Sequence, residues 1–192
     1  MMSLKHTVRL VAALNLAYFF VEFGVATRIG SVSLFADSVD FLEDASVNLL
    51  IAVALSWSPK RRAEMGMLLA VLLLAPGIAT LWTAWHEFQV RIAPEPRLFS
   101  ITGMGALAVN LTCAFLLARF RTHSGSLTKA AFLSARNDAL ANVAIVVAAA
   151  LTAVTSSIWP DLLVGLGIAV MNADAAREVW QASRDERRAA LA

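Results

Sequence analysis

The sequence predicts an all-α membrane protein with six transmembrane helices, and three observations support this prediction. The chain has 192 residues, of which 59% are hydrophobic and 16% charged, and its mean hydropathy is +0.69. A soluble domain of this length has about 45–50% apolar residues and could not bury such an excess. Apolar stretches of about 20 residues, the length that spans a bilayer as a helix, recur along the chain. Basic residues are enriched in every second connection between the predicted helices.

Three of the predicted spans contain no charged residue, namely 65–85, 98–118 and 139–158. The other three contain acids: Glu22 in the first span, four carboxylates in the second, and acids at both ends of the sixth. The fifth helix extends backward beyond its apolar stretch. We expect one domain, 1–192, with helices at approximately 8–28, 33–57, 64–90, 98–120, 128–156 and 158–181.

Basic residues predict the orientation in the membrane. They gather at both termini and after the second and fourth helices, whereas the connection after the fifth helix has none. The positive-inside rule therefore places both termini in the cytoplasm. Tryptophans near the predicted helix ends suit an aromatic belt; they are Trp57, Trp82, Trp85, Trp159 and Trp180. We expect residues 1–27 to be a span, because a signal-peptide reading finds no convincing cleavage site.

Composition also excludes several function classes. The net charge is +2, which gives no sign of a polyanionic partner, so no nucleic acid is expected. Cys113 is the single cysteine, and it can form neither an internal disulfide nor a thiolate zinc cluster. A disordered tail and a secreted disulfide scaffold are excluded as well.

The second predicted helix contains four acids within eight residues, Asp37, Asp40, Glu43 and Asp44. Asp40 and Asp44 lie one helical turn apart on one face, and Asp37 lies on nearly the same stripe one turn earlier. Carboxylates at mid-bilayer are expensive and usually functional. Two so close together need a cation, a proton or a base between them. Arg136 is the only base well inside a span, so we favour a cation path over ion pairing.

The fifth predicted helix repeats this spacing with Ser134 and Asp138. If it lies beside the second helix, it could close a site begun by Asp40 and Asp44. Oxygen ligands suit manganese, iron, cobalt and magnesium as well as zinc. Three carboxylates around a divalent ion leave about one negative charge, so a proton would compete for the site when the metal leaves.

Several stretches spread over almost the whole chain match one family pattern. They are N…E…G at Asn15, Glu22 and Gly24, S-x-S-L-x-A-D-S at 31–38, H/D-x-x-x-D at 40–44, an asparagine at Asn110 followed by 114–117, A-A-F-L-H-x-x-x-D at 130–138, and W-P-D at 159–161. With them the chain resembles the transmembrane domain of the cation diffusion facilitator family of metal/proton antiporters.

The resemblance implies a site for a transported metal made of Asp40, Asp44, Asp138 and Ser134. Ser134 stands where the family has a histidine, and a neutral hydroxyl is the weaker ligand. Asn137 or a water could complete the ligand shell. The missing histidine also removes a group that titrates near neutral pH. We therefore expect the cargo to be zinc, cobalt, manganese, iron or a similar divalent cation, with no resident cofactor.

Further polar residues in the spans have expected roles beside this site. Glu22, Asp37 and Asn137 are candidates for the ion pathway. Asp161 follows Pro160 at a helix start, where an acid complements the helix dipole, so capping is its expected role. Small residues are expected to permit close helix packing; they are Gly103, Gly105, Gly165 and Gly167.

Glu43 and Arg136 are additions to the family motifs, on helices that would be neighbours. We expect them to form a buried ion pair, which would satisfy an otherwise costly arginine. In the alternative, Arg136 acts as a tethered cation near Asp138 and weakens metal binding.

These expectations describe a secondary transporter, not an enzyme, that exports divalent metal cations from the cytoplasm in exchange for protons. Its partners would be metal ions, protons, the lipid bilayer of a bacterial inner (plasma) membrane, and a second copy of the chain. Most family members continue into a cytosolic domain that joins the dimer. The sequence stops at Ala192, so we expect a homodimer formed through the membrane helices or the short tail.

Two other function classes stay open. A transport-dead paralogue acting as a partner subunit is supported by Ser134 and Arg136. A membrane enzyme similar to CDP-alcohol phosphotransferases would hold a metal diphosphate with D-x-x-x-D. That motif requires D-G-x-x-A-R upstream, which is missing before Asp40, and no basic cluster near Asp40 could hold phosphates.

Overall fold

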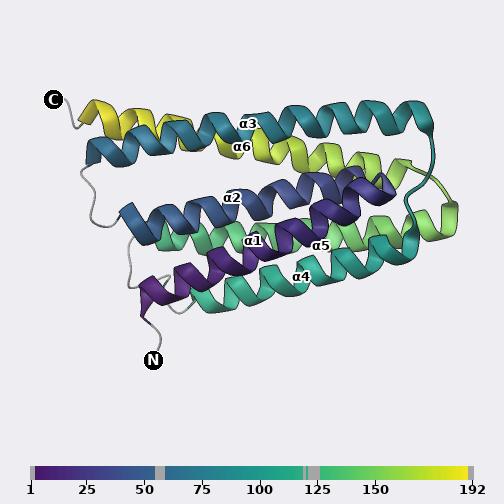
Figure 1. Ribbon diagram of the computed structural model, residues 1–192, viewed down its shortest axis with the longest axis horizontal. Helices are drawn as coiled ribbons and strands as arrows, with labels where there is room; N and C mark the ends of the chain where they lie inside the picture. The colour runs from purple at the N-terminus through teal and green to yellow at the C-terminus, as the bar shows by residue number, and fades with distance from the viewer. Residues whose placement is uncertain (1–2, 55–58, 119, 121–125, 190–192) are drawn as a thin grey trace.

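The computed structural model describes residues 3–54, 59–118, 120 and 126–189, and within these residues it contains six α-helices running along one long axis (Figure 1). The side chains of some residues inside the helices, most of them in α3 and early α5, lie outside the description. The helices are α1 (Leu4–Ile29), α2 (Val32–Ala54), α3 (Pro59–Val90), α4 (Pro96–Ala118), α5 (Ser126–Thr155) and α6 (Trp159–Ala189).

The expected all-helical architecture is confirmed, and the helix bounds differ most at the starts of the first and third helices and at the end of the sixth. The third helix begins at Pro59 instead of near residue 64. The first helix begins at Leu4, and the sixth continues to Ala189 instead of ending near residue 181. Among the described residues, three stretches are long and apolar enough to cross a membrane: α1, α4 and Asn137–Thr155 of α5. The first of these qualifies despite Glu22. The expected span 65–85 falls largely on side chains outside the description.

Local chemistry explains where individual helices begin and end. Gly30 ends α1 in the left-handed conformation (φ 67°), and its N–H donates to the carbonyl of Ala26. At the start of α4, Pro96 provides a preset φ angle. The Glu95 carboxylate accepts hydrogen bonds from the main-chain N–H groups of Arg97 (2.9 Å) and Leu98 (2.8 Å). These caps satisfy main-chain groups that a helix end leaves free.

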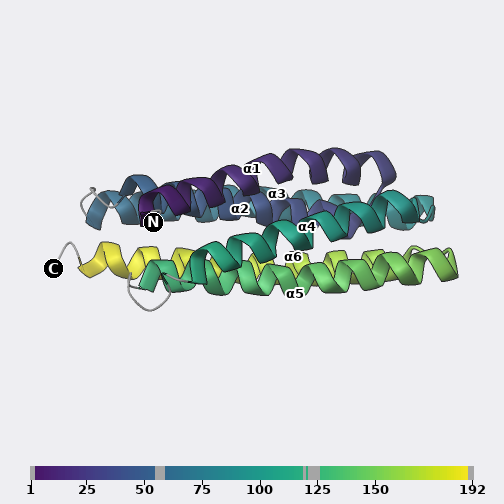
Figure 2. The same cartoon turned by 90° about the horizontal axis from the view of Figure 1, so that it is seen from below.

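Four helices form one bundle, and the remaining two flank it. Within the bundle, α1 packs against α2 and α4, and α5 packs against α4 and α2. The flanking helices α3 and α6 pack against each other and against α2, and α6 also contacts α5 (Figures 1 and 2). Both termini lie at the same end of the long axis (Figure 1). Their placement in the cytoplasm stays a prediction.

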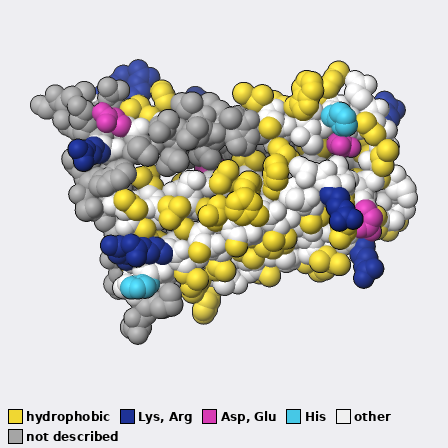
Figure 3. All heavy atoms as spheres, viewed as in Figure 1, with side chains coloured by type: hydrophobic (Ala, Val, Ile, Leu, Met, Phe, Trp, Pro, Cys, Tyr) yellow, Lys and Arg dark blue, Asp and Glu magenta, His cyan; other side chains and the backbone are white. Residues whose placement is uncertain are grey.

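The surface suits a bilayer around the middle of the molecule. On the part of the face that Figure 3 colours by type, hydrophobic side chains are spread over the middle, whereas most basic, acidic and histidine side chains lie toward the two ends. Large apolar side chains such as Phe115 and Val154 are 80% and 86% exposed. Exposed apolar area on this scale marks a membrane surface.

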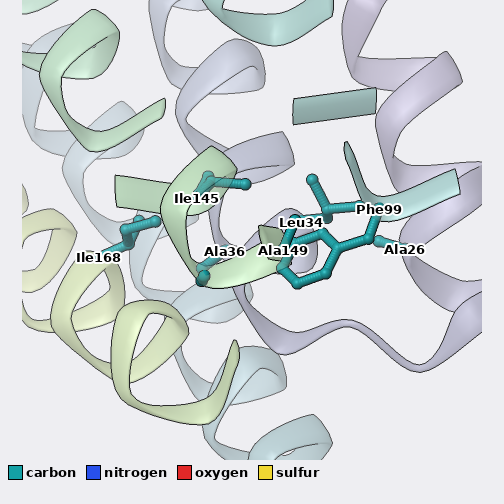
Figure 4. Close-up of a cluster of buried hydrophobic side chains, with 8 residues drawn as sticks. Ala26, Leu34, Ala36, Phe99, Ile145, Ala149 and Ile168 are labelled. Atoms are coloured by element: carbon teal, nitrogen blue, oxygen red, sulfur yellow. The ribbon is translucent and has the colours of Figure 1, made fainter. Parts of the chain in front are cut away.

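The interior contains a hydrophobic cluster contributed by five helices (Figure 4). Its buried members are Ala26 of α1, Leu34 and Ala36 of α2, Phe99 of α4, Ile145, Ala148 and Ala149 of α5, and Ile168 of α6. This cluster joins α6 to the four-helix bundle and fixes the first half of α2, the helix that bears the acids.

Glycines permit the closest helix contacts at three of the four expected positions. A Cβ on Gly165 of α6 would lie 2.7 Å from the main-chain nitrogen of Ser33 in α2. A Cβ on Gly103 would lie 2.9 Å from Ile145, and one on Gly105 would overlap the Tyr18 hydroxyl. The expectation for Gly167 is wrong, because none of the described atoms lies within 4 Å of a Cβ there.

Gly165→Ala is therefore expected to destabilise the bundle by about 1–3 kcal/mol, the usual effect of overpacking. Its Cβ would meet the α2 backbone, which cannot rotate away as a side chain can. Gly167→Ala is the matched control, two residues along the same helix and facing open space. The measurement is thermal unfolding of the detergent-solubilised protein. Equal unfolding temperatures for the two variants would contradict the close α2–α6 contact.

Candidate cation site

An acidic pocket lies where α2, α5 and α6 meet. Its volume is about 130 Å³, enough for an ion and water, since one water needs about 10–15 Å³ by this measure. Its lining residues are Asp40, Glu43, Asp44, Asn137, Asp138, Met171 and Asn172. The structure thus brings together, from two helices, the three aspartates that the sequence pattern pointed to.

Helix geometry positions these side chains. Asp40 and Asp44 are one turn apart on α2, and Asp138 reaches the same pocket from α5. Asp44 is buried, whereas Asp40 and Asp138 are half-buried. Among the described side chains, no group of three His, Cys, Asp or Glu residues is close enough together to hold a metal ion. The aspartates share a cavity without converging on one point.

Two pocket residues on α6 were missed by the sequence reasoning. Met171 and Asn172 line the pocket beside the aspartates. A signal for Asn172 was present, because it is the first side chain with a polar group after Asp161 in an otherwise apolar run. An amide carbonyl and a thioether are both recognised metal-ligand types. The pocket therefore offers ligand chemistry from three helices.

Two expected site residues cannot be placed. The side chains of Ser134 and Arg136 lie outside the described residues, so the serine ligand and the Glu43–Arg136 ion pair stay predictions. Glu43 itself is half-buried and lines the acidic pocket. Glu43 thus adds a fourth carboxyl group to the described lining of the pocket.

The three expected pathway residues divide into two groups. Asn137 lines the acidic pocket, whereas Glu22 and Asp37 do not. Glu22 and Asp37 are both 0% exposed and lie deeper between α1, α2 and α5. The amide nitrogen of Asn142 donates to Asp37 Oδ1 (3.1 Å) and to the carbonyl oxygen of Asp138 (2.8 Å). Asn142 therefore connects the deeper carboxyl groups to a residue of the pocket.

Asp161 stands in the first turn of its own helix, as expected, and it also caps a second helix. It is buried in the first turn of α6, and its carboxylate accepts hydrogen bonds from the start of α2. The donors are the Ser31 hydroxyl (2.8 Å), the Val32 N–H (2.7 Å), the Ser33 N–H (3.0 Å) and the Ser33 hydroxyl. This explains the S-V-S sequence before the acids, because both serines bind the same carboxylate and fix the helix that carries Asp40 and Asp44.

The comparison with known families agrees with this architecture. The family model for the cation efflux transmembrane domain matches residues 8–185 of the 192. No curated protein sequence matches the chain significantly. Members of the matched family are cation transporters that reside in membranes, and the apolar helices described above suit that location. The chain therefore belongs to the cation diffusion facilitator family, through its cation efflux transmembrane domain.

Proposed function

We propose that the chain exports divalent metal cations from the cytoplasm in exchange for protons, and that the acidic pocket is the transport site. The observation that carries the proposal is the meeting of Asp40, Asp44 and Asp138 in one cavity inside a cation efflux domain. Carboxylates within a membrane favour a bound cation or proton over an empty, charged site.

Charge and ligand chemistry support exchange of a metal ion for protons. A divalent ion would neutralise two of the three aspartate charges, and protons would neutralise them after the ion leaves. Because the carboxylates do not converge on one point in this conformation, metal binding would draw the aspartate side chains of α2 and α5 toward the ion. Rocking of α3 and α6 against the other four helices would then open the pocket to each side in turn.

The cargo proposed here is zinc, cobalt, manganese, iron or a similar ion. Carboxylates and the amides of Asn137 and Asn172 are hard oxygen ligands, whereas the Met171 sulfur is soft. Ser134 would be a weak ligand from α5. The membrane is proposed to be a bacterial inner membrane, with a homodimer formed through the helices. The Glu43–Arg136 ion pair remains part of the proposal, and reversing both charges should restore transport that either single reversal removes.

A competition panel tests the function. The purified chain is reconstituted in liposomes that contain a pH-sensitive dye, and zinc, cobalt, manganese, iron and magnesium are added separately. If the chain is a transporter, at least one of the transition metals should cause proton movement. The metals that cause it should compete with one another. Calorimetry on the same preparation measures metal binding and so distinguishes a transporter from a transport-dead partner subunit. Metal binding without proton movement would favour that alternative, and no binding of any ion would contradict a metal site.

A further inference from the structure

Two fully buried carboxyl groups outside the acidic pocket lie against each other. Glu22 of α1 and Asp37 of α2 are 0% exposed, and their side chains are within hydrogen-bonding reach of one another. Both Glu22 oxygens and Asp37 Oδ2 have no other hydrogen-bond donor among the described groups. The one donor to the pair within the described part of the chain is the Asn142 amide, on Asp37 Oδ1.

Two ionised carboxylates cannot make such a contact. An ionised carboxylate only accepts hydrogen bonds, so a bond between two carboxyl groups requires that one of them is protonated. Burying two unpaired negative charges side by side would also be far more costly than burying one shared charge. One proton between Glu22 and Asp37 supplies the missing donor and removes one of the charges.

Among the side chains that the structure describes, none that faces the pair carries a positive charge that could replace that proton. Facing the pair are Tyr18 on α1 and Asp40 and Asp44 on α2. Asn142 faces it from α5. Asp161 of α6 lies one turn away at the start of α2 and is occupied by its own donors. The only charged residue of α4 is Arg97 in its first turn. The charged groups that face the pair among the described residues are therefore all acidic.

We propose that Glu22 and Asp37 together bind one proton, at a site separate from the acidic pocket, and that this proton is released when a divalent cation enters that pocket. The release rests on the proposed function, whereas the shared proton does not. On release the O–H bond of the carboxyl group breaks, its electron pair stays on the carboxylate oxygen, and the proton passes to water.

The coupling follows from charge and from the hydrogen bonds between the two sites. Asp37 precedes Asp40 by one turn of α2, and Asn142 bonds both Asp37 and the main chain of Asp138. A divalent cation beside Asp40 and Asp138 would stabilise negative charge on the nearby pair and so favour loss of its proton. The exchange would then include a proton that no pocket aspartate carries.

Infrared spectroscopy of the purified, metal-free chain tests the shared proton directly. The wild-type protein should show the carbonyl stretch of a protonated carboxylic acid at neutral pH, shifted in D₂O. Glu22→Gln and Asp37→Asn should each remove this contribution, since the amide then donates to the remaining carboxylate. Glu64→Gln changes an exposed glutamate in the same way and should leave it intact. An unchanged band in both Glu22→Gln and Asp37→Asn would overturn the proposal.

The coupling is tested by counting protons. Calorimetric titration with the active metal, repeated in buffers of different ionisation enthalpy, gives the protons released per ion bound. Glu22→Gln should bind the metal and release about one proton fewer than the wild type, while Glu64→Gln should match the wild type. Equal counts for wild type and Glu22→Gln would overturn the coupling. If the wild type binds no metal, the proposed function fails, and the infrared result still decides whether the proton is shared.

Discussion

Asp44→Asn is expected to weaken metal binding by at least about 100-fold and to abolish metal transport. Even residues that only orient metal ligands change affinity by about 10–100-fold, and Asp44 would contact the ion itself. The substitution keeps the shape of the side chain and replaces a charged carboxylate with a neutral amide. Asp44 is buried and lines the acidic pocket, and a water molecule in its place could supply a ligand oxygen but not the lost charge.

Asp138→Asn should have a similar effect, because Asp138 brings the only carboxylate of α5 in the described lining of the pocket. The double variant should be little worse than either single variant, since both residues would serve one ion. Asp174→Asn is the control, an exposed acid on α6 outside the pocket lining. Calorimetry measures binding, and liposome flux measures transport. Wild-type affinity in Asp44→Asn would show that the pocket is not the metal site.

Asp161→Ala is expected to destabilise the protein by about 3 kcal/mol or more. The substitution removes an acceptor from four donors and leaves the buried N–H groups of Val32 and Ser33 without it. Each unsatisfied buried group costs about 1–3 kcal/mol, and a lost helix cap costs about 0.5–2 kcal/mol. The start of α2 would also pack less tightly against α6, at the place where Gly165 allows the two helices to approach closely.

Thermal unfolding in detergent measures this effect, with Asp185→Ala as the control. Asp185 lies on the same helix and is 75% exposed, so its loss should leave the unfolding temperature nearly unchanged. The unfolding temperature of Asp161→Asn should lie between those of the two alanine variants. Its amide oxygen can accept hydrogen bonds from some of the donors, whereas its amide nitrogen is itself a donor and cannot accept from the others. Unfolding of Asp161→Ala at the wild-type temperature would contradict a capping role.

Sequence patterns predicted the helices well because length and hydropathy in a membrane leave few alternatives. They failed for helical segments that are not apolar, because hydropathy does not indicate such segments. The last part of α6, up to Ala189, is charged and helix-forming, so it continues as a helix beyond the expected apolar span. The open space beside Gly167 could not be predicted either, since it depends on which face of α6 meets α2.

The candidate site was predicted along each helix but not between helices. The four-residue spacing on α2 placed Asp40 and Asp44 on one face, the similar spacing on α5 pointed to Asp138, and all three line the acidic pocket. No spacing along one helix could reveal that Asp161 of α6 caps α2, or that Glu22 of α1 meets Asp37. The role of Asn172 was missed because it depends on the contact of α6 with α2 and α5. These contacts follow from tertiary packing.

Metal-driven proton movement shows whether the acidic pocket exchanges a divalent cation for protons. Liposomes containing wild-type protein, and others containing Asp44→Asn, are loaded with a pH-sensitive dye, and the active metal is then added outside without a pre-formed pH gradient. Metal entering through the wild-type protein should drive protons out of the liposomes, and Asp44→Asn should give no change. No proton movement with the wild type, or equal movement through the variant, would contradict this exchange.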